Sequence, residues 1–238
     1  MTVVCITQAR MTSTRLPGKV MLPVLGRSLL AWHLDRLNHA RRVDVVAVAT
    51  VDSPESAPIA AVANQLGNPV TFGPEDDVLA RYVACARTHD AHVVVRVTSD
   101  CPLIDPVLVD ACIDRFLELG VDYLNLDITS FPRGFDCEVF TRAALEEAAA
   151  LACDPAEHEH VTPYIYRHPE KFRMAQLGGG EGAEYRLCVD QALDFKLVSH
   201  ILTALADKDI FGWRDVVDFL RANPEWADIN HDVHQKVC

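Results

Sequence analysis

The chain has 238 residues, half of them hydrophobic and 24% charged, a composition typical of a globular protein and not of a disordered one. Its length suits one sizeable α/β domain. The formal net charge of −12 argues against a general binder of nucleic acid or of anionic membranes, since such binders need a basic surface.

The start of the chain and its cysteines predict a cytoplasmic protein. Met1 leads directly into an apolar stretch, without a basic segment or cleavage site, and no apolar run is long enough to cross a bilayer. The cysteines are scattered, without a C-x-x-C pair, at positions 5, 85, 101, 112, 137, 153, 188 and 238. We therefore expect reduced thiols and no dedicated zinc site. The acidic and histidine-rich stretch 157–160 is expected to face solvent or substrate.

Strands and amphipathic helices alternate along the first half of the chain. We predict strands at 2–6, 44–50, 69–72, 92–98 and 122–126, and helices at 29–41, 57–66, 76–89 and 106–119. Continuous β-branched runs separated by such helices are typical of a parallel sheet covered on both faces. We expect a Rossmann-like α/β fold, with ligands at the carboxyl ends of the strands.

The loop QARMTSTRLPGK at 8–19 follows the first strand and carries three cations, Arg10, Arg15 and Lys19. It matches neither the P-loop pattern nor G-x-G-x-x-G. A strand followed by a flexible cationic loop and a helix is nevertheless an arrangement that binds polyphosphate. The alternative is a basic loop exposed to water. We expect a nucleotide to bind Gln8, Ala9, Arg10, Met11, Thr12, Ser13, Arg15 and Lys19.

Two aspartates are candidates for holding a metal ion at the same edge of the sheet. Asp100 follows the predicted strand 92–98, and Pro102 stiffens its turn. Asp190 ends the strand-like segment 185–189. Two carboxylates beside a triphosphate suit Mg²⁺, which takes oxygen ligands. The alternative for each is a structural role, a turn or helix N-cap for Asp100 and a helix N-cap for Asp190.

The second half of the chain changes in pattern. Residues 127–185 contain an extended segment, an alanine-rich helix, a helix around 158–167 and a glycine-rich tip at 178–182. Amphipathic helix returns over 190–222, where we expect a core face of Leu193, Leu197, Ile201, Leu202 and Leu205. We divide the single domain 1–238 into a nucleotide-binding half (1–126), an excursion (127–185) and a C-terminal part (186–238).

Candidate acceptor-binding residues lie in and after this excursion's first segment. Arg133 has a planar fork that binds carboxylates or phosphates, and Glu138 can accept hydrogen bonds from hydroxyls. We expect His160 and Tyr164 one helical turn apart on one face. Each has a structural alternative, namely a surface ion pair, a strand-edge charge or a packed pair. The full candidate set is Arg133, Asp136, Glu138, His160 and Tyr164.

Three further residues belong to the candidate nucleotide site or its surroundings. Arg81, on the helix predicted at 76–89, and Arg96 are expected either to form ion pairs or to reach the nucleotide, and Thr98, at the end of a strand, is expected to reach the nucleotide. Arg96 lies within the predicted buried strand 92–98, and a charge there requires an anionic partner.

Six segments in order resemble the spore coat polysaccharide biosynthesis protein F-like family, related to the 3-deoxy-manno-octulosonate cytidylyltransferases. They are the loop at 8–19, EDDVLARY at 75–82, VVRVTSDCPLIDP at 94–106, PRGFDCEVF at 132–140, EHVTPYIYRHPEKF at 159–172 and YRLCVDQALDF at 185–195. The resemblance implies a nucleotidyltransferase that uses CTP and an acidic sugar. It also implies Mg²⁺ on Asp100 and Asp190, and a homodimer in which residues 127–185 project from the sheet and cap the acceptor.

The mechanism expected from these parts is an in-line attack of an acceptor oxygen on the α-phosphorus, with pyrophosphate leaving. Arg10, Lys19 and Asp100 would carry the catalysis by neutralising charge. The chain departs from the family at Cys188, where threonine is usual, and at residues 191–192, where Thr-Pro is usual. The rival interpretations are a nucleotide-sugar glycosyltransferase of the same fold, a cytidylyltransferase for a phosphonate or sugar phosphate, and a non-catalytic nucleotide sensor.

Overall fold

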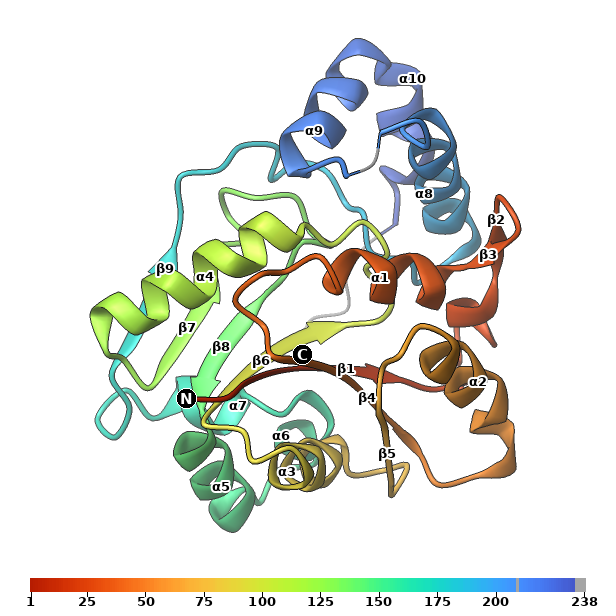
Figure 1. Cartoon of the computed structure of the whole chain (residues 1–238). Coiled ribbons are helices and arrows are strands. Elements are labelled where there is room, and N and C mark those ends of the chain that lie inside the picture. Colours follow the sequence, from red (N-terminus) through yellow and green to blue (C-terminus); the bar gives the residue numbers. More distant parts are fainter. Residues whose placement is uncertain (209, 234–238) are drawn as a thin grey trace.

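A seven-stranded sheet forms the centre of the protein in the computed structural model, which describes residues 1–208 and 210–233 (Figure 1). The strand order is β5-β4-β1-β6-β8-β7-β9. The strands are β1 (Val3–Ala9), β4 (Val45–Val51), β5 (Val70–Gly73), β6 (Val93–Thr98), β7 (Tyr123–Leu126), β8 (Glu138–Thr141) and β9 (Met174–Leu177). Strands β5, β4, β1 and β6 pair in parallel, which confirms the predicted mostly parallel sheet.

Helices cover both faces of this sheet (Figure 1). They are α1 (Leu29–Leu37), α2 (Ala57–Gln65), α3 (Val78–Thr88), α4 (Pro106–Leu119), α5 (Arg142–Leu151), α6 (Pro155–His160), α7 (Pro163–Arg167), α8 (Ala192–Ala204), α9 (Trp213–Ala222) and α10 (Pro224–Ala227). A short 3-10 helix, η1 (Lys19–Met21), and a hairpin of β2 (Pro23–Val24) and β3 (Arg27–Ser28) connect the first loop to α1.

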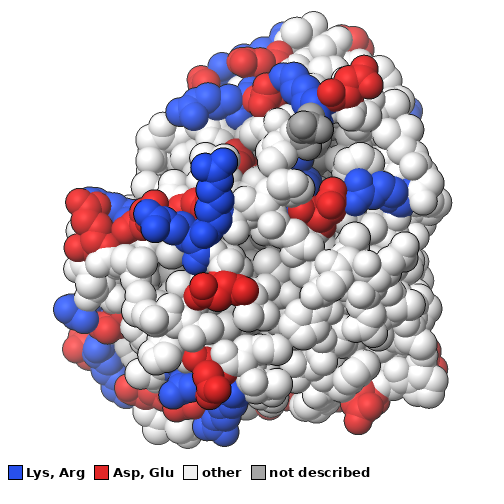
Figure 2. Space-filling view, in the orientation of Figure 1, with Lys and Arg blue, Asp and Glu red and all other residues white. Residues whose placement is uncertain are grey.

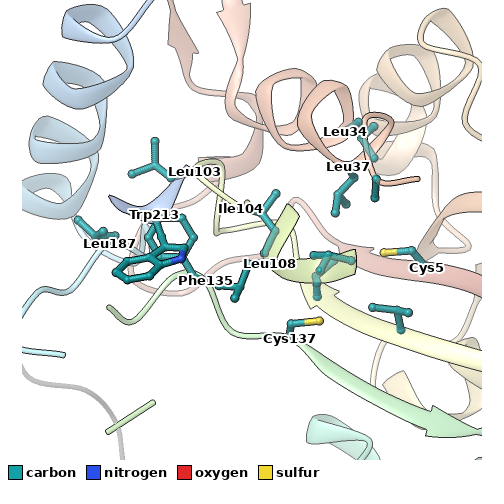
Figure 3. Packing of buried hydrophobic residues seen from close by; sticks show 14 of the residues in the cluster. Cys5, Leu34, Leu37, Leu103, Ile104, Leu108, Phe135, Cys137, Leu187 and Trp213 are labelled. Atoms are coloured by element: carbon teal, nitrogen blue, oxygen red, sulfur yellow. The ribbon is translucent and has the colours of Figure 1, made fainter. Parts of the chain in front are cut away.

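Two hydrophobic clusters correspond to the two faces. One contains the buried sides of α1, α2, α4, α8 and α9. Figure 3 shows part of this cluster, with Trp213 of α9 beside Phe135 and Leu103. The other contains the buried sides of α3, α5 and α7. Burial of both faces explains why the central strands are continuously apolar instead of alternating.

The segment 127–185 is built into the sheet over part of its length, whereas the sequence predicted an excursion that projects from it. Strand β8 inserts between β6 and β7 and is antiparallel to both, and β9 pairs with β7. Val139 and Phe140 of β8 are fully buried on opposite faces of the sheet, in the two different clusters. Burial of these two side chains stabilises the insertion of β8 into the sheet.

The helix predicted around 158–167 is two short helices. Val161 has φ 73°, which ends α6, and Pro163 begins α7. Proline has no N–H with which to continue the hydrogen bonding of a preceding helix, so the chain changes direction there. The expectation that His160 and Tyr164 share one helical face is therefore wrong.

Two expectations for the C-terminal part also need correction. Residues 185–189 form no ladder strand, and only an isolated bridge joins Arg186 to Arg133. Leu193 is 46% exposed, although Leu197, Ile201, Leu202 and Leu205 are buried as predicted. The inward position at the start of α8 is occupied by Asp194, which is fully buried, and this turns Leu193 outward.

Three further observations concern the surface charges, the cysteines and the lengths of the helices. Figure 2 shows Lys and Arg interspersed with Asp and Glu on the face in view. The seven cysteines within the described residues are free of disulfides, and Cys238 lies outside them. No helix in residues 1–208 and 210–233 combines the length and the apolar character that crossing a bilayer needs.

His33 of α1 connects strand β1 to the turn that carries Cys101. It is fully buried, its Nδ1 is 2.9 Å from the Cys101 carbonyl oxygen, and its Nε2 is 2.9 Å from Thr7 Oγ1. Because a carbonyl only accepts, Nδ1 carries the proton, and Nε2 accepts from the threonine hydroxyl. Burial lowers the pKa of His33 from 6.5 to about 4, so the ring stays neutral in the folded protein.

This neutral histidine predicts an acid-sensitive fold. An unfolded His33 binds a proton below pH 6.5, whereas the folded one does so only near pH 4, so stability falls as pH drops through that window. Between about pH 7 and about pH 5, the unfolding free energy should fall by about 2 kcal/mol because of His33. Urea unfolding at several pH values measures it. His33→Gln keeps a donor and an acceptor without titrating, and the wild-type slope should shrink in that variant; an unchanged slope would contradict the assignment.

Candidate active site

A cavity of about 470 Å³ opens at the carboxyl ends of β1 and β6. It lies where the predicted loop and the Asp100 turn meet, as expected for ligand sites in such sheets. Its lining consists of Gln8, Ala9, Arg10, Ser13, Thr14, Arg15, Lys19, Val20, Val78, Arg81, Arg96, Thr98, Ser99, Asp100, Cys101, Arg133, Asp136, Glu159, His160, Cys188 and Asp190.

The loop after β1 is shaped by its own backbone. The Met11 carbonyl accepts hydrogen bonds from the N–H groups of Ser13 and Gly18, and Gly18 has φ 66°, a conformation that glycine adopts without strain. Met11 packs against the core, and Thr12 Oγ1 donates to Glu75 at 2.5 Å. Met11 and Thr12 therefore hold the loop and do not line the cavity, while the other six predicted loop residues do.

Asp100 and Asp190 come together around Lys19. Lys19 Nζ lies 2.8 Å from Asp100 Oδ2 and 2.9 Å from Asp190 Oδ1. A backbone hydrogen bond from Val189 N to Asp100 O, 2.7 Å long, joins the two segments that carry the carboxylates. The structure thus brings residues 90 positions apart onto a single cation, as the predicted shared site requires.

Asp190 has two further cationic neighbours. Arg15 lies 2.9 Å from Oδ1, and Arg186 lies 2.6 Å from Oδ2. The residue that precedes α8 is Gln191, and Asp194 Oδ2 accepts from the N–H groups of Asp190 and Gln191. Asp194 therefore caps this turn, and the helix-cap alternative for Asp190 is wrong.

Asp100 likewise has no capping role. The N-cap of α4 is Asp105, whose Oδ1 accepts from Val107 and Leu108. Burial raises the pKa of both Asp100 and Asp190, but the adjacent Lys19 more than offsets this, and each pKa lies below its usual value. Burial lowers the pKa of Lys19, and the two carboxylates raise it to above its usual value. All three groups are therefore charged at neutral pH.

Arg133, Asp136 and His160 of the predicted acceptor set line the cavity. Gly134 has φ 112°, and a Cβ there would lie 2.7 Å from the Leu187 carbonyl carbon, so only glycine permits this close approach. The Gly134 N–H donates to Asp136 Oδ2. Among the described residues the guanidinium of Arg133 has no ion-pair partner, which leaves it available to an anionic ligand.

Glu138 and Tyr164 lie outside the cavity lining. Glu138 pairs with Arg96 across β6 and β8 and accepts from the hydroxyls of Tyr123 and Thr162. The Arg96 guanidinium thus has the anion that its buried strand position requires. Tyr164 is 5% exposed, packs in the core beside Phe172, and its hydroxyl accepts from Lys171.

The remaining predicted residues, Arg81, Gln8 and Thr98, line the cavity. Arg81 is held by the carbonyl oxygens of Pro74 and Glu75 instead of by a carboxylate. Burial and the nearby Arg10 lower its pKa. Burial also lowers the pKa of His160, which favours the neutral ring.

Several site residues were missed at the level of sequence. Thr14 and Ser99 line the cavity, and the Ser99 hydroxyl donates to the carbonyl oxygen of Gln8, a predicted residue. Arg186 contacts Asp190, and its position four residues earlier was the signal that could have identified it. Residues of the 157–160 stretch differ in position. Glu159 and His160 line the cavity, whereas Glu157 completes the capping box of α6.

The donor set fits a hard divalent cation that binds together with a nucleotide. Within the described part of the chain, no cluster of three or more His, Cys, Asp or Glu side chains can hold a metal ion by itself. Asp100 and Asp190 supply two convergent carboxylates, and Mg²⁺ commonly takes one or two carboxylates with phosphate oxygens and water.

Sequence comparisons identify the class to which this fold and site belong. The profile of the cytidylyltransferase family matches residues 4–215. The chain is 30% identical over 230 residues to the spore coat polysaccharide biosynthesis protein SpsF of Bacillus subtilis, covering 93% of this chain and 95% of that protein. It is 35% identical over 201 residues to a 3-deoxy-manno-octulosonate cytidylyltransferase of Anaeromyxobacter sp. (strain K), covering 76% and 81%.

Solved structures agree with this. A cytidylyltransferase from Leptospira borgpetersenii superimposes with a TM-score of 0.91 at 30% identity, over 100% of this chain and 99% of that one. A manganese complex of Rv0371C from Mycobacterium tuberculosis has a TM-score of 0.62 at 18% identity, over 84% and 99%, and shares the fold. The site and fold are those of a nucleotidyltransferase. The chain belongs to the cytidylyltransferase family and is a CTP-dependent enzyme, which sets aside the glycosyltransferase and sensor alternatives.

The buried Arg96–Glu138 ion pair predicts that replacing Glu138 lowers the stability of the protein. Glu138→Gln leaves the buried Arg96 charge without its anion, and breaking one partner of such a pair typically costs about 3 kcal/mol. Urea denaturation measures the loss of unfolding free energy, and the double variant Arg96→Met/Glu138→Gln should recover part of it. A Glu138→Gln protein of wild-type stability that instead binds its acceptor poorly would contradict the structural role.

Proposed function

We propose that this enzyme transfers CMP from CTP to an acidic sugar or a chemically similar acceptor, with release of pyrophosphate, and that the product serves surface polysaccharide or glycoconjugate synthesis. The observation that carries the acceptor class is the cavity's charge. Arg133 lines the cavity and has no ion-pair partner among the described residues. The similarity to SpsF and to 3-deoxy-manno-octulosonate cytidylyltransferases supports the same class.

The nucleotide side of the cavity suits a triphosphate. Arg10, Arg15 and Lys19 neutralise the phosphates, and Arg81 adds a cation whose orientation is fixed by backbone carbonyls. Gln8 and Thr98, at the ends of neighbouring strands, contribute polar groups beside them. Such transfers require positioning and neutralisation of charge more than covalent catalysis.

On the acceptor side, the Arg133 guanidinium binds a carboxylate of the acceptor. The Asp136 carboxylate accepts hydrogen bonds from its hydroxyls, and His160 donates to them or accepts from them. The neutral ring of His160 carries one donor and one acceptor, which suits a polyol. We place Glu138 and Tyr164 behind this surface, as residues that stabilise it.

Asp100 and Asp190 are the residues that would hold Mg²⁺. When bound, this ion offsets the charge that develops on the α-phosphoryl group and on pyrophosphate. Arg186 keeps the Asp190 carboxylate oriented toward the cavity, since it contacts the oxygen that Lys19 does not use. We place the enzyme in the reducing cytoplasm, where its free thiols persist.

Pyrophosphate release tests the function. The protein is mixed with Mg²⁺, one nucleoside triphosphate at a time, and a panel of sugar acids, sugar phosphates and phosphonates. CTP with a sugar acid should release pyrophosphate, and Arg10→Ala or Lys19→Ala should lower turnover by orders of magnitude, since losing one charge-assisted contact costs ~2–4 kcal/mol of transition-state stabilisation. Activity with sugar phosphates or phosphonates alone would overturn the acidic-sugar assignment, and near-normal variants would overturn the triphosphate site.

A second prediction concerns the metal carboxylates. Activity should vanish with EDTA and return with Mg²⁺ or Mn²⁺, and Asp100→Asn or Asp190→Asn should lower kcat much more than CTP affinity. The double variant should be little worse than either single one, because both carboxylates would serve one ion. Steady-state kinetics and CTP titration provide the measurements. A largely active Asp190→Asn beside an inactive Asp100→Asn would mean a site with one carboxylate.

We further propose a homodimer in which residues 127–185 cap the acceptor site of the partner. Ile128, Tyr166 and Met174 of this segment are exposed apolar side chains, which a partner copy would cover. Light scattering at micromolar concentration should give twice the 26.4 kDa chain mass. A monomer at that concentration would refute the dimer and, with it, the shared acceptor pocket.

A further inference from the structure

The Lys19 ammonium occupies the position between the carboxylates that a divalent cation would need. It lies 2.8 Å from Asp100 Oδ2 and 2.9 Å from Asp190 Oδ1. The Lys19 side chain is only 13% exposed, so water screens these contacts weakly. Carboxylate oxygens are also the ligands of Mg²⁺, and each oxygen lone pair serves one partner at a time. The lysine ammonium and a metal ion that bridged both carboxylates would need the same space and carry charge of the same sign, so they compete for this position.

We propose that Lys19 is an internal counter-ion that the divalent cation displaces, so that metal and CTP bind cooperatively; this inference rests on the proposed function. A lysine ammonium is a point charge on a flexible four-carbon stem, which lets it leave one anion for another. The triphosphate supplies the new anion. One cation then replaces another between the carboxylates, and the displaced charge moves onto the phosphates.

The charges around Asp190 explain why the metal should bind poorly without the nucleotide. Lys19 and Arg15 both approach Oδ1, and Arg186 approaches Oδ2. A metal ion arriving alone would have to break buried ion pairs and would face these positive charges. CTP removes that cost, because its phosphates attract Lys19 and Arg15 away from the carboxylates.

Arg186 differs from Lys19 in a way that makes Lys19 the mobile partner. The Arg186 guanidinium also lies 3.4 Å from the fully buried Asp194, whose Oδ1 accepts from Asn230. Its planar fork is thus fixed on two carboxylates of one turn. Lys19 instead bridges two carboxylates from separate segments, and moving its ammonium disturbs neither segment's backbone.

Linkage makes the effect reciprocal, since the factor by which CTP strengthens metal binding must equal the factor by which the metal strengthens CTP binding. The test measures Mn²⁺ binding to the nucleotide-free protein by the electron paramagnetic resonance signal of free Mn²⁺. Lys19→Met should bind Mn²⁺ roughly ten-fold or more tightly than the wild type, because the competing cation and its charge-assisted bonds are gone. The same titration with CTP present should show a smaller gain for Lys19→Met than for the wild type.

Arg10→Ala is the matched control. It removes a cation from the same cavity, but Arg10 lies 3.7 Å from Glu159 and pairs with neither aspartate. Its Mn²⁺ affinity without CTP should stay within about two-fold of the wild type, since its charge is 42% exposed and screened by solvent. If Arg10→Ala and Lys19→Met gained Mn²⁺ affinity equally, the gain would come from the general charge of the cavity. That result would overturn the proposed exchange.

Lys19→Gln provides a second neutral variant and should shift Mn²⁺ affinity in the same direction; if Lys19→Met fails to fold, Lys19→Gln decides. A folded neutral variant that binds Mn²⁺ no more tightly than the wild type overturns the proposal. Pyrophosphate release by the wild type is measured separately. Its absence would refute the proposed function while the nucleotide-free Mn²⁺ comparison still decides the exchange.

Discussion

The ammonium of Lys19 between Asp100 and Asp190 is the interaction on which the architecture of the site depends. Two carboxylates this close would otherwise repel each other, and one would take up a proton. The shared cation keeps both ionised, as their lowered pKa values indicate. The hydrogen bond from Val189 N to Asp100 O then fixes the two segments side by side, so that backbone and charge impose the same geometry.

Buried hydrogen bonds and ion pairs connect the elements around this point. His33 connects Thr7 of β1 to the Cys101 carbonyl, and this links the strand that precedes the 8–19 loop to the turn that carries Asp100. The Arg96–Glu138 pair joins β6 to β8 beneath the cavity. Buried hydrogen bonds and ion pairs of this kind favour one arrangement of the site.

Insertion of β8 between β6 and β7 determines which connection passes over the carboxyl edge of the sheet. An antiparallel strand there begins at the carboxyl edge of the sheet, so the connection that precedes it, residues 127–137, passes over that edge. Arg133, in this connection, consequently lines the cavity together with residues of the 8–19 loop. Residues from both halves of the chain therefore line one cavity, together with Asp100.

The sequence alone determined the alternation of buried strands and amphipathic helices, the cationic loop after β1 and the family, because these depend on local patterns and on motif order. It did not predict that β8 lies inside the sheet, that the helix ends at Val161 or that Leu193 is exposed. Each of these features depends on which residues the rest of the chain buries. Asp190 was recognised as a candidate, and only the structure shows that it does not cap α8, whose first turn is held by Asp194. Only the tertiary structure brings Asp100, Asp190 and Lys19 onto one another, because contacts between distant segments leave no trace in local periodicity.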